Sequence, residues 1–164
     1  MRYVVYIFMT DITPFITALQ DPTIKKRLAA ARALGRSGNL SAVRPLVQAL
    51  SDPHPNVRRE AAQALARLDD GEAVPGLIAA LSDPDPEVKA AVLAALMRLK
   101  DRRAVEPVCR CLDDRKEIIR IGAAEVLGKL GDPRAIEPLK RMANDPFSDV
   151  REAAERSIKK LRKK

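Results

Sequence analysis

The residues able to do chemistry in this chain are few. One histidine, His54, and two cysteines, Cys109 and Cys111, are the only nitrogen and sulfur ligands that zinc-like metals favour. A metal site needs three or four ligands, so we expect no metal and no cofactor. Cys109 and Cys111 lie two apart on a predicted helix, which points their side chains about 200° apart and prevents a mutual disulfide. We expect His54 to cap a helix and both cysteines to fill core positions.

Five aspartates are the remaining candidates for acid–base chemistry, but their spacing indicates a structural role. They recur every 31 residues, and a basic residue follows each of them six positions later: Asp21/Arg27, Asp52/Arg58, Asp83/Lys89, Asp114/Arg120 and Asp145/Arg151. A catalytic site is needed once, whereas this pair occurs five times. The chain also shows no nucleophile–base pair and no Gly-rich phosphate loop, so we expect no enzyme activity.

The same 31-residue period runs through the apolar residues. One column of the repeat holds Leu34, Leu65, Leu96, Leu127 and Ile158. Within one unit, Val57, Ala61, Leu65 and Leu68 fall on one face of a helix, and a second apolar run follows a short break at residues 69–71. A fixed period of this length is typical of a solenoid. The sequence therefore predicts an all-α array of about ten short helices.

We expect one repeat array over residues 11–164. It consists of a half repeat at 11–20, full repeats at 21–51, 52–82, 83–113 and 114–144, and a basic C-terminal capping helix at 145–164. Residues 1–10 contain the apolar run YVVYIFM and form an extension or partial cap. This segment could instead pair with a second copy to make a homodimer, or precede a biological start at Met9.

The charge of the chain is concentrated at one end. The 164 residues carry a net charge of +8, and seven basic against two acidic residues in the stretch 151–164 account for +5 of it. This favours a solubilising cap over a nucleic-acid or anionic-membrane contact. No run approaches the ~20 apolar residues of a membrane span. Free cysteines without a secretory signal predict a cytoplasmic protein.

The motifs resemble the HEAT-like repeat of the phycobilisome-lyase type. The match rests on DPHPNVRREAAQALARLDD with AVPGLIAAL, and on DRKEIIRIGAAEVLGKLGD with AIEPLKRMA. The resemblance implies a right-handed α–α superhelix. It also implies that each Asp and its basic partner form a ladder between units, and that the second helix of each unit lines the inner curve. The family includes subunits of bilin lyases and many interaction scaffolds.

On that inner face, one set of polar residues is the candidate partner-binding site. Arg103, Glu106 and Arg110 lie at i, i+3 and i+7, and a second trio repeats them one layer on. Arg44 and Gln48 border a shallow notch left by small residues at 75, 76 and 79. The candidate residues are Arg44, Gln48, Arg103, Glu106, Arg110, Arg134, Glu137 and Arg141. The arginines would receive an acidic partner. Alternatively, each Glu pairs with its own Arg and the face is merely solvated.

These observations predict a non-catalytic scaffold or adaptor that binds another protein on the concave face of the solenoid. The alternative from another class is a bilin- or chromophore-lyase-like accessory subunit, as the resemblance implies. Nucleic-acid binding is disfavoured, because the chain has no Trp and no aromatic residue on the inner face.

Overall fold

The computed structural model describes residues 11–163, which form ten α-helices. The long helices have 13 to 15 residues and are α2 (Ile24–Arg36), α4 (Pro55–Leu68), α6 (Pro86–Leu99), α8 (Glu117–Leu130) and α10 (Ser148–Arg162). The short helices have six or seven residues and are α1 (Thr13–Ala18), α3 (Val43–Ala49), α5 (Val74–Ala80), α7 (Val105–Arg110) and α9 (Ile136–Arg141). A three-residue 3₁₀ turn precedes each of α3, α5, α7 and α9. No strand occurs within residues 11–163.

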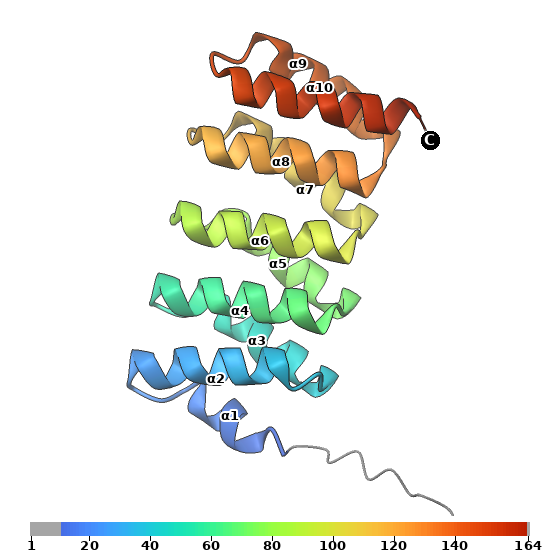
Figure 1. The fold of residues 1–164 in the computed structure, drawn as a ribbon. Helices are drawn as coiled ribbons and strands as arrows, with labels where there is room; N and C mark the ends of the chain where they lie inside the picture. Colours follow the sequence, from blue (N-terminus) through green and yellow to red (C-terminus); the bar gives the residue numbers. More distant parts are fainter. Residues whose placement is uncertain (1–10, 164) are drawn as a thin grey trace, which may run out of the picture.

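The long helices stack in one layer and the short helices form a second layer behind them (Figure 1). Each long helix packs against the next one along the chain, from α2 to α10. The array therefore runs from one end to the other in sequence order, and each layer is covered by its neighbours. The predicted all-α solenoid is confirmed. The exact repeat boundaries stay a prediction.

Local signals place the ends of the long helices where the sequence predicts them. His54 caps α4, because its Nδ1 accepts a hydrogen bond of 3.2 Å from the Asn56 amide. At the other end, the helices stop where the backbone turns left-handed, at Asp69 (φ 56°), Lys100 (φ 53°) and Gly131 (φ 72°). Glycine adopts this conformation freely, whereas a side chain such as that of Lys100 is strained in it.

Leucines from both layers build the core between them. The long helices bury Leu34, Leu65, Leu96 and Leu127 completely. The short helices contribute Leu46, Leu77 and Leu139, which are also completely buried. One such leucine is worth roughly 1.5–3 kcal/mol relative to leaving it in water. The sequence period is therefore the period of the core.

Two glycines let neighbouring long helices approach very closely. A Cβ built on Gly35 of α2 would lie 2.6 Å from the Cα of Ala64 in α4. A Cβ built on Gly128 of α8 would lie 2.5 Å from the hydroxyl oxygen of Ser157 in α10. Both distances are far too short for real atoms, so the sequence must place glycine at these contacts.

The predictions for the apolar segment 1–10 lie outside the described residues. They concern its role as a cap, its pairing with a second copy and the start at Met9, and they stay predictions. The basic helix at the C-terminal end is α10, which covers Ser148–Arg162. Among the described residues, no helix is both long and apolar enough to cross a membrane.

Candidate functional site

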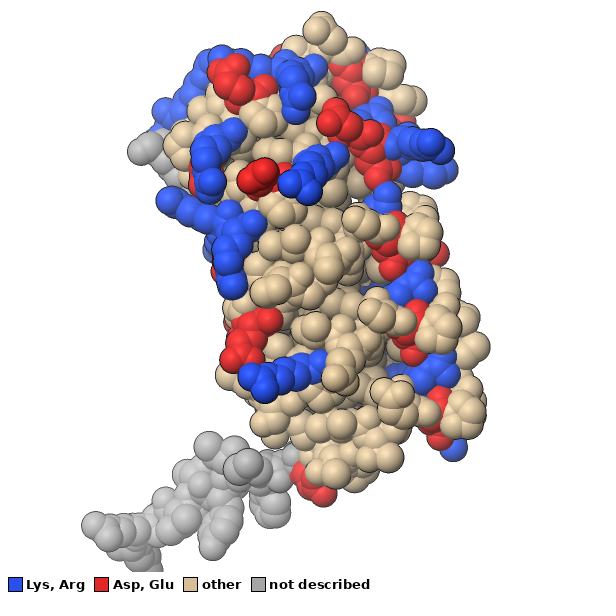
Figure 2. All heavy atoms as spheres, turned by 180° about the vertical axis from the view of Figure 1, so that it is seen from behind, with Lys and Arg blue, Asp and Glu red and all other residues tan. Residues whose placement is uncertain are grey.

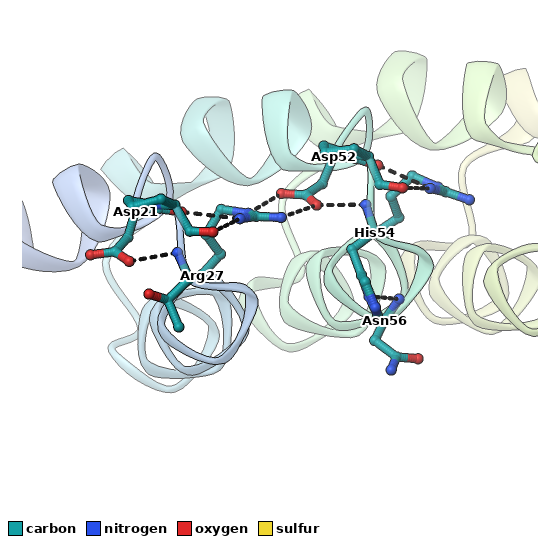
Figure 3. A network of polar contacts seen from close by, with 9 residues as sticks. Asp21, Arg27, Asp52, His54 and Asn56 are labelled. Atoms are coloured by element: carbon teal, nitrogen blue, oxygen red, sulfur yellow. Dashed lines mark hydrogen bonds and ion pairs between the residues drawn. The ribbon is translucent and has the colours of Figure 1, made fainter.

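A ladder of charged hydrogen bonds runs along one edge of the array and accounts for the repeated aspartates. Arg27 of α2 donates from Nε and Nη2 to the two carboxylate oxygens of Asp52, at 2.7 and 2.9 Å. The other rungs also join residues 25 positions apart. Arg58–Asp83 and Arg120–Asp145 have the same two hydrogen bonds, and Lys89 donates from Nζ to Asp114. Figure 3 shows the Arg27–Asp52 rung, which links the long helix α2 to the loop that leads into α4. The aspartates therefore hold neighbouring layers together.

The sequence predicted the ladder but not its pairing. The arginine of a rung contacts the carboxylate of the following unit, and it reaches its own unit only through main-chain carbonyls. Arg58 shows both contacts, because its Nη1 donates to the carbonyl of Asp52 at 2.9 Å while its Nε donates to Asp83 at 2.6 Å. The aspartate also accepts the amide two residues further on, as Asp52 does from His54 at 2.8 Å. One carboxylate thus fixes both the loop and the interlayer contact.

Electrostatics keep these carboxylates ionised. Burial alone would raise the pKa of Asp52, but hydrogen bonds from Arg27 and from the His54 amide lower it by more, so its pKa falls below the ordinary value. At Asp145 the hydrogen bond from Arg120 is the largest influence, and the pKa is lowered again. A general acid needs a raised pKa, so these groups are poorly suited to acid catalysis.

The remaining reactive residues take the structural roles expected from the sequence. Cys111 is buried and Cys109 is half-buried, and both thiols are free. Burial raises the pKa of the Cys111 thiol to about 11, so it holds little thiolate at neutral pH. Within residues 11–163, no group of three or more His, Cys, Asp or Glu residues is placed to hold a metal ion.

All of the candidate partner-binding residues lie on the short-helix face, which we define as the exposed side of α1, α3, α5, α7 and α9 with the 3₁₀ turns before them. All eight of these residues are exposed to solvent: Arg44, Gln48, Arg103, Glu106, Arg110, Arg134, Glu137 and Arg141. The structure therefore brings the whole set to one side of the array. Their surroundings divide them into fixed and free groups.

Two of the arginines are held by aspartates that the sequence analysis did not single out. Arg103 donates to both oxygens of Asp101 at distances from 2.7 to 3.1 Å, and it also reaches the Gly71 carbonyl at 3.0 Å. Arg134 donates to Asp132 at 2.8 and 3.0 Å, which lowers the pKa of that carboxyl to about 2. Both aspartates also accept the amide of the same arginine. Their 31-residue spacing is the signal that could have found them.

The charged residues on α7 and α9 are less tightly held. Glu106 and Arg110 face each other at 3.6 Å, and both side chains are more than three-quarters exposed. Glu137 pairs with Lys140 at 2.7 Å rather than with either neighbouring arginine. Arg141 forms no ion pair with a described residue. Arg110 and Arg141 are therefore the arginines most available to a partner.

The N-terminal half of the short-helix face has a different character. Arg44 approaches Glu72 at 3.7 Å, and the other exposed positions of α1, α3 and α5 are uncharged. Figure 2 shows this side: charged side chains gather toward the C-terminal end, whereas a broad stretch nearer the N-terminal end is almost free of them. The repeat position of Arg110 is occupied by Ala79 in α5 and Gln48 in α3. The face is thus largely uncharged in its N-terminal half and charged in its C-terminal half.

The predicted notch in α5 is partly filled. Val47 of α3 occupies the space next to Gly76, because a Cβ built on that glycine would lie 2.6 Å from the Val47 Cγ1. Beside this contact, an open hollow of about 390 Å³ is lined by Val47, Gly76, Ala79 and Ala80 among others. The hollow is shallow and largely apolar, so it suits a protruding apolar side chain rather than a charged group.

Comparisons with known proteins agree with this architecture. The family of HEAT repeats matches residues 12–82 and 74–159. No curated protein matched the chain in the sequence comparison.

Among solved structures, the chain is similar to one in the complex of CpcE and CpcF of phycocyanin lyase from Nostoc sp. PCC7120, with 30% identity and a TM-score of 0.79. The match covers 92% of this chain and 64% of that one. The YibA protein of E. coli shares 24% identity with a TM-score of 0.70, over 93% of this chain and 54% of its own. A designed armadillo repeat protein in complex with the peptide (KR)4 shares 20% identity with a TM-score of 0.67, over 92% and 81% of the two chains. On the family match and the stacked two-layer fold, the chain belongs to the HEAT repeat family.

Proposed function

We propose that this chain is a non-catalytic scaffold or adaptor that binds another protein on its short-helix face. The observation that carries the proposal is the division of that face into a charged half over α7 and α9 and a largely uncharged half over α1, α3 and α5, where Arg44 and Glu72 pair with each other. Stacked repeats offer an extended surface on which each layer contributes one set of side chains. Such a surface suits a protein partner whose own surface is likewise charged at one end and uncharged at the other.

The contrast between constant and variable repeat positions supports the proposal. Positions that stack the layers keep one chemical character throughout, as the ladder aspartates do. An exposed position at the C-terminal end of the short helices instead changes from layer to layer, through Thr17, Gln48, Ala79, Arg110 and Arg141. Stacking imposes no demand on these exposed side chains, so their differences are free to determine which partner binds.

The partner that fits is acidic at one end and uncharged at the other. Arg110 and Arg141 supply the cations for the acidic part, because neither is held by a short hydrogen bond. Arg103 and Arg134 are already bound to aspartates and serve mainly to shape the edge of the site. Arg44, Gln48 and the apolar hollow beside Gly76 would contact the uncharged part of the partner. Glu106 and Glu137 would discriminate against partners with acidic groups in the wrong register.

The test compares partner recovery between matched variants. Affinity capture from the native host with the wild-type chain is set beside Arg110→Glu/Arg141→Glu, which reverses two free cations on the proposed site. The control is Lys25→Glu/Arg36→Glu, which makes the same charge change on two exposed residues of α2. We expect the specific partner to be lost from the first variant and retained by the second. Unchanged recovery with Arg110→Glu/Arg141→Glu would reject the proposed site.

A further variant tests the uncharged half separately. Ala79→Glu places a charge beside the apolar hollow on α5 and leaves α7 and α9 unchanged. If the partner contacts both halves, recovery falls with this variant as well. A partner recovered normally with Ala79→Glu would restrict the site to α7 and α9.

A second candidate function is an accessory subunit of a chromophore lyase. The similarity to the CpcE–CpcF complex, at 30% identity, favours it. The chain spans 64% of the chain that it matches, so any shared role would be that of a part. Titrating the protein with a free bilin tests this function, because binding changes the absorption spectrum of the pigment. A flat difference spectrum would reject direct pigment binding.

A further inference from the structure

A column of cations lies at the C-terminal ends of the long helices. The last turn of every long helix holds a basic residue at the same repeat position: Arg36, Arg67, Arg98, Lys129 and Lys160. A cation here interacts favourably with the helix dipole, which explains the presence of the column. The surroundings of its members differ, however, and these differences create a distinct surface.

The carboxylate that neutralises the column in α4 is missing further along. Glu60 is buried and accepts hydrogen bonds from Arg67 at 3.2 Å and from Arg32 at 2.9 Å. The position of Glu60 is taken by Ala91 in α6 and by Gly122 in α8. Neither Arg98 nor Lys129 forms an ion pair with any described residue, and the same holds for Lys160 and Lys100. The members of this column beyond α4, and Lys100 beside them, are therefore free.

These free cations surround an open hollow of about 650 Å³ between α6, α8 and α10. Its cationic lining is Arg98, Lys100, Lys129, Arg156 and Lys160, and its two carboxylates are Asp69 and Glu125. Arg156 lies 3.4 Å from Glu152 and 4.0 Å from Glu125, so it is the one cation already engaged. The side chains of Ala94, Met97 and Ala153 add an apolar component.

The hollow exists because α6 and α8 pack less closely than the other neighbouring long helices. Where α2 meets α4 and α8 meets α10, a glycine allows close approach, at Gly35 and Gly128 respectively. The same repeat position in α6 is Met97, which is only half-buried and lines the hollow. A bulky side chain in place of glycine holds the two helices apart.

We propose that this hollow is a second docking site, which binds an extended acidic segment of another protein. Neighbouring helices lie about 8–10 Å apart, which is close to the length of three residues in the polyproline II conformation at about 3.1 Å each. That conformation has three residues per turn, so every third side chain lies on one face. Acidic side chains at every third position of such a segment would therefore meet Arg98, Lys129 and Lys160 in turn. The apolar floor receives an aliphatic side chain between them, and Met97 adapts readily to different shapes.

The lining favours a protein segment over a nucleic acid. No aromatic side chain lines the hollow, so nothing there stacks on bases. Glu60 neutralises Arg67 in α4, so the run of free cations beside the hollow begins at α6 and covers α6, α8 and α10. Three layers span roughly 20 Å, which matches about six residues in the polyproline II conformation. The site is built only by long helices and their C-terminal ends, so it is separate from the short-helix face and goes beyond the function proposed above.

The probe for the test is a fluorescent peptide with three copies of Glu-Pro-Val. Its prolines favour an extended conformation with about 3.1 Å per residue, which places glutamates about 9 Å apart. A peptide with three copies of Gln-Pro-Val is the uncharged control. Fluorescence anisotropy at low salt should show binding of the Glu peptide and not of the Gln peptide. Equal binding of the two peptides, or no binding of either, would overturn the proposal.

Variants then locate the site. Arg98→Glu/Lys129→Glu should weaken binding of the Glu peptide at least about tenfold, equivalent to the loss of one good charged contact. Lys25→Glu/Arg36→Glu is the matched control, since Arg36 occupies the same position in α2 and the charge change is identical. Arg98→Gln/Lys129→Gln should also weaken binding, and it replaces the first variant if the charge reversal impairs folding. If Arg98→Glu/Lys129→Glu and the control variant lose the same affinity for the peptide, the attraction is unspecific and the proposed site is rejected.

One variant separates the shape of the hollow from its charge. Ala94 is exposed on α6 and lines the hollow, so Ala94→Trp fills it without changing any charge. We expect a loss of peptide binding with the helical circular dichroism unchanged. Wild-type affinity in this variant would overturn the proposal. Two other ligands are tested in parallel: a single-stranded DNA 12-mer and a phosphatidylserine vesicle. If either binds more tightly than the peptide and loses this binding in Arg98→Glu/Lys129→Glu, the occupant is not a protein segment and the proposal is overturned.

Discussion

The ladder rung between Arg58 and Asp83 should be one of the strongest polar contributions to the stability of the array. The Asp83 carboxylate accepts hydrogen bonds from Arg58 at 2.6 and 2.8 Å and from the Asp85 amide at 2.9 Å. The two side chains are only 13% and 6% exposed, so water competes little for them. The variants that test this contribution are Asp83→Ala, Arg58→Met and the double variant.

The magnitude follows from the contacts that each variant removes. Hydrogen bonds to charged groups contribute about 1.5–3 kcal/mol, and removing one partner of a buried pair costs about 3–5 kcal/mol. Because Arg58 keeps its bond to the Asp52 carbonyl and retains some access to water, we expect about 2–3 kcal/mol for Asp83→Ala. The double variant should cost less than the sum of the two single ones, with a coupling energy of about 1–2 kcal/mol.

Urea unfolding of the four proteins measures this coupling as a double-mutant cycle. The exposed pair Glu137–Lys140 serves as the control, because its side chains are 79% and 47% exposed and its coupling should stay below about 0.5 kcal/mol. Equal m-values across the set are required, since a repeat array can lose cooperativity when a layer is weakened. A coupling between Arg58 and Asp83 no larger than that of the control pair would refute the reasoning.

The same rung also predicts the pH dependence of the coupling. Burial acts to raise the pKa of Asp83, but the hydrogen bonds from Arg58 and the Asp85 amide outweigh it and lower the pKa. A carboxylate with a lowered folded-state pKa stabilises the fold fully above its unfolded pKa of about 3.9 and loses that contribution as the pH falls through its folded value. The coupling should therefore be equal at pH 7 and pH 5 and decline only below about pH 4. A decline between pH 7 and pH 5 would contradict this assignment.

Other predictions concern packing, backbone strain and thiol reactivity. Gly128→Ala should destabilise the array by about 1–3 kcal/mol, because the added Cβ would clash with Ser157. In Gly122→Ala the added Cβ would lie 3.3 Å from the flexible Leu93 side chain, so this variant should be neutral or slightly stabilising. Thermal unfolding of both variants tests these two expectations. Lys100→Gly should stabilise the array by about 0.5–1 kcal/mol in the same assay, because glycine adopts the left-handed backbone conformation without strain. Asp69→Gly should stabilise it by less, because Asp tolerates that conformation better than Lys does. Iodoacetamide should label Cys111 at pH 8 at least about tenfold more slowly in the folded protein than in urea, because the thiol is buried and its pKa is raised. Equal labelling rates in the two conditions would contradict the buried position.

The sequence was sufficient to predict the fold because the same side chains must solve the same packing problem in every layer. Leu65 and Leu96 occupy one column since each fills the space between the two helical layers. The aspartates of the ladder could likewise be found from their period. Their partners could not be assigned in detail, because a period of 31 cannot tell whether Arg58 bonds to Asp52 or to Asp83. The structure shows the second, with the carbonyl of Asp52 as an additional acceptor.

The candidate sites were harder to predict because availability, rather than residue type, decides whether a charge can bind. Arg103 and Arg110 looked equivalent in the sequence, yet Arg103 is fixed by Asp101 while Arg110 has one long contact with Glu106. The spacing to Asp101 is only two residues, which is not a spacing that places side chains on one helical face. It becomes a contact because Asp101 caps the 3₁₀ turn that contains the arginine.

The basic column at the ends of the long helices makes the same point more sharply. Arg67 and Arg98 occupy one repeat position and share the benefit of the helix dipole, so the sequence period treats them alike. Arg67 is neutralised by Glu60, whereas the helix that carries Arg98 has an alanine at that position and a methionine that opens the adjacent hollow. The carboxylate is a feature of α4 alone, and the methionine stands where α2 and α8 have glycine, so neither difference lies at the charged residue itself. We propose that together they turn a stabilising feature into a surface able to bind. In an array whose constant positions maintain the stack, function should therefore be sought where the neighbours of a constant residue change.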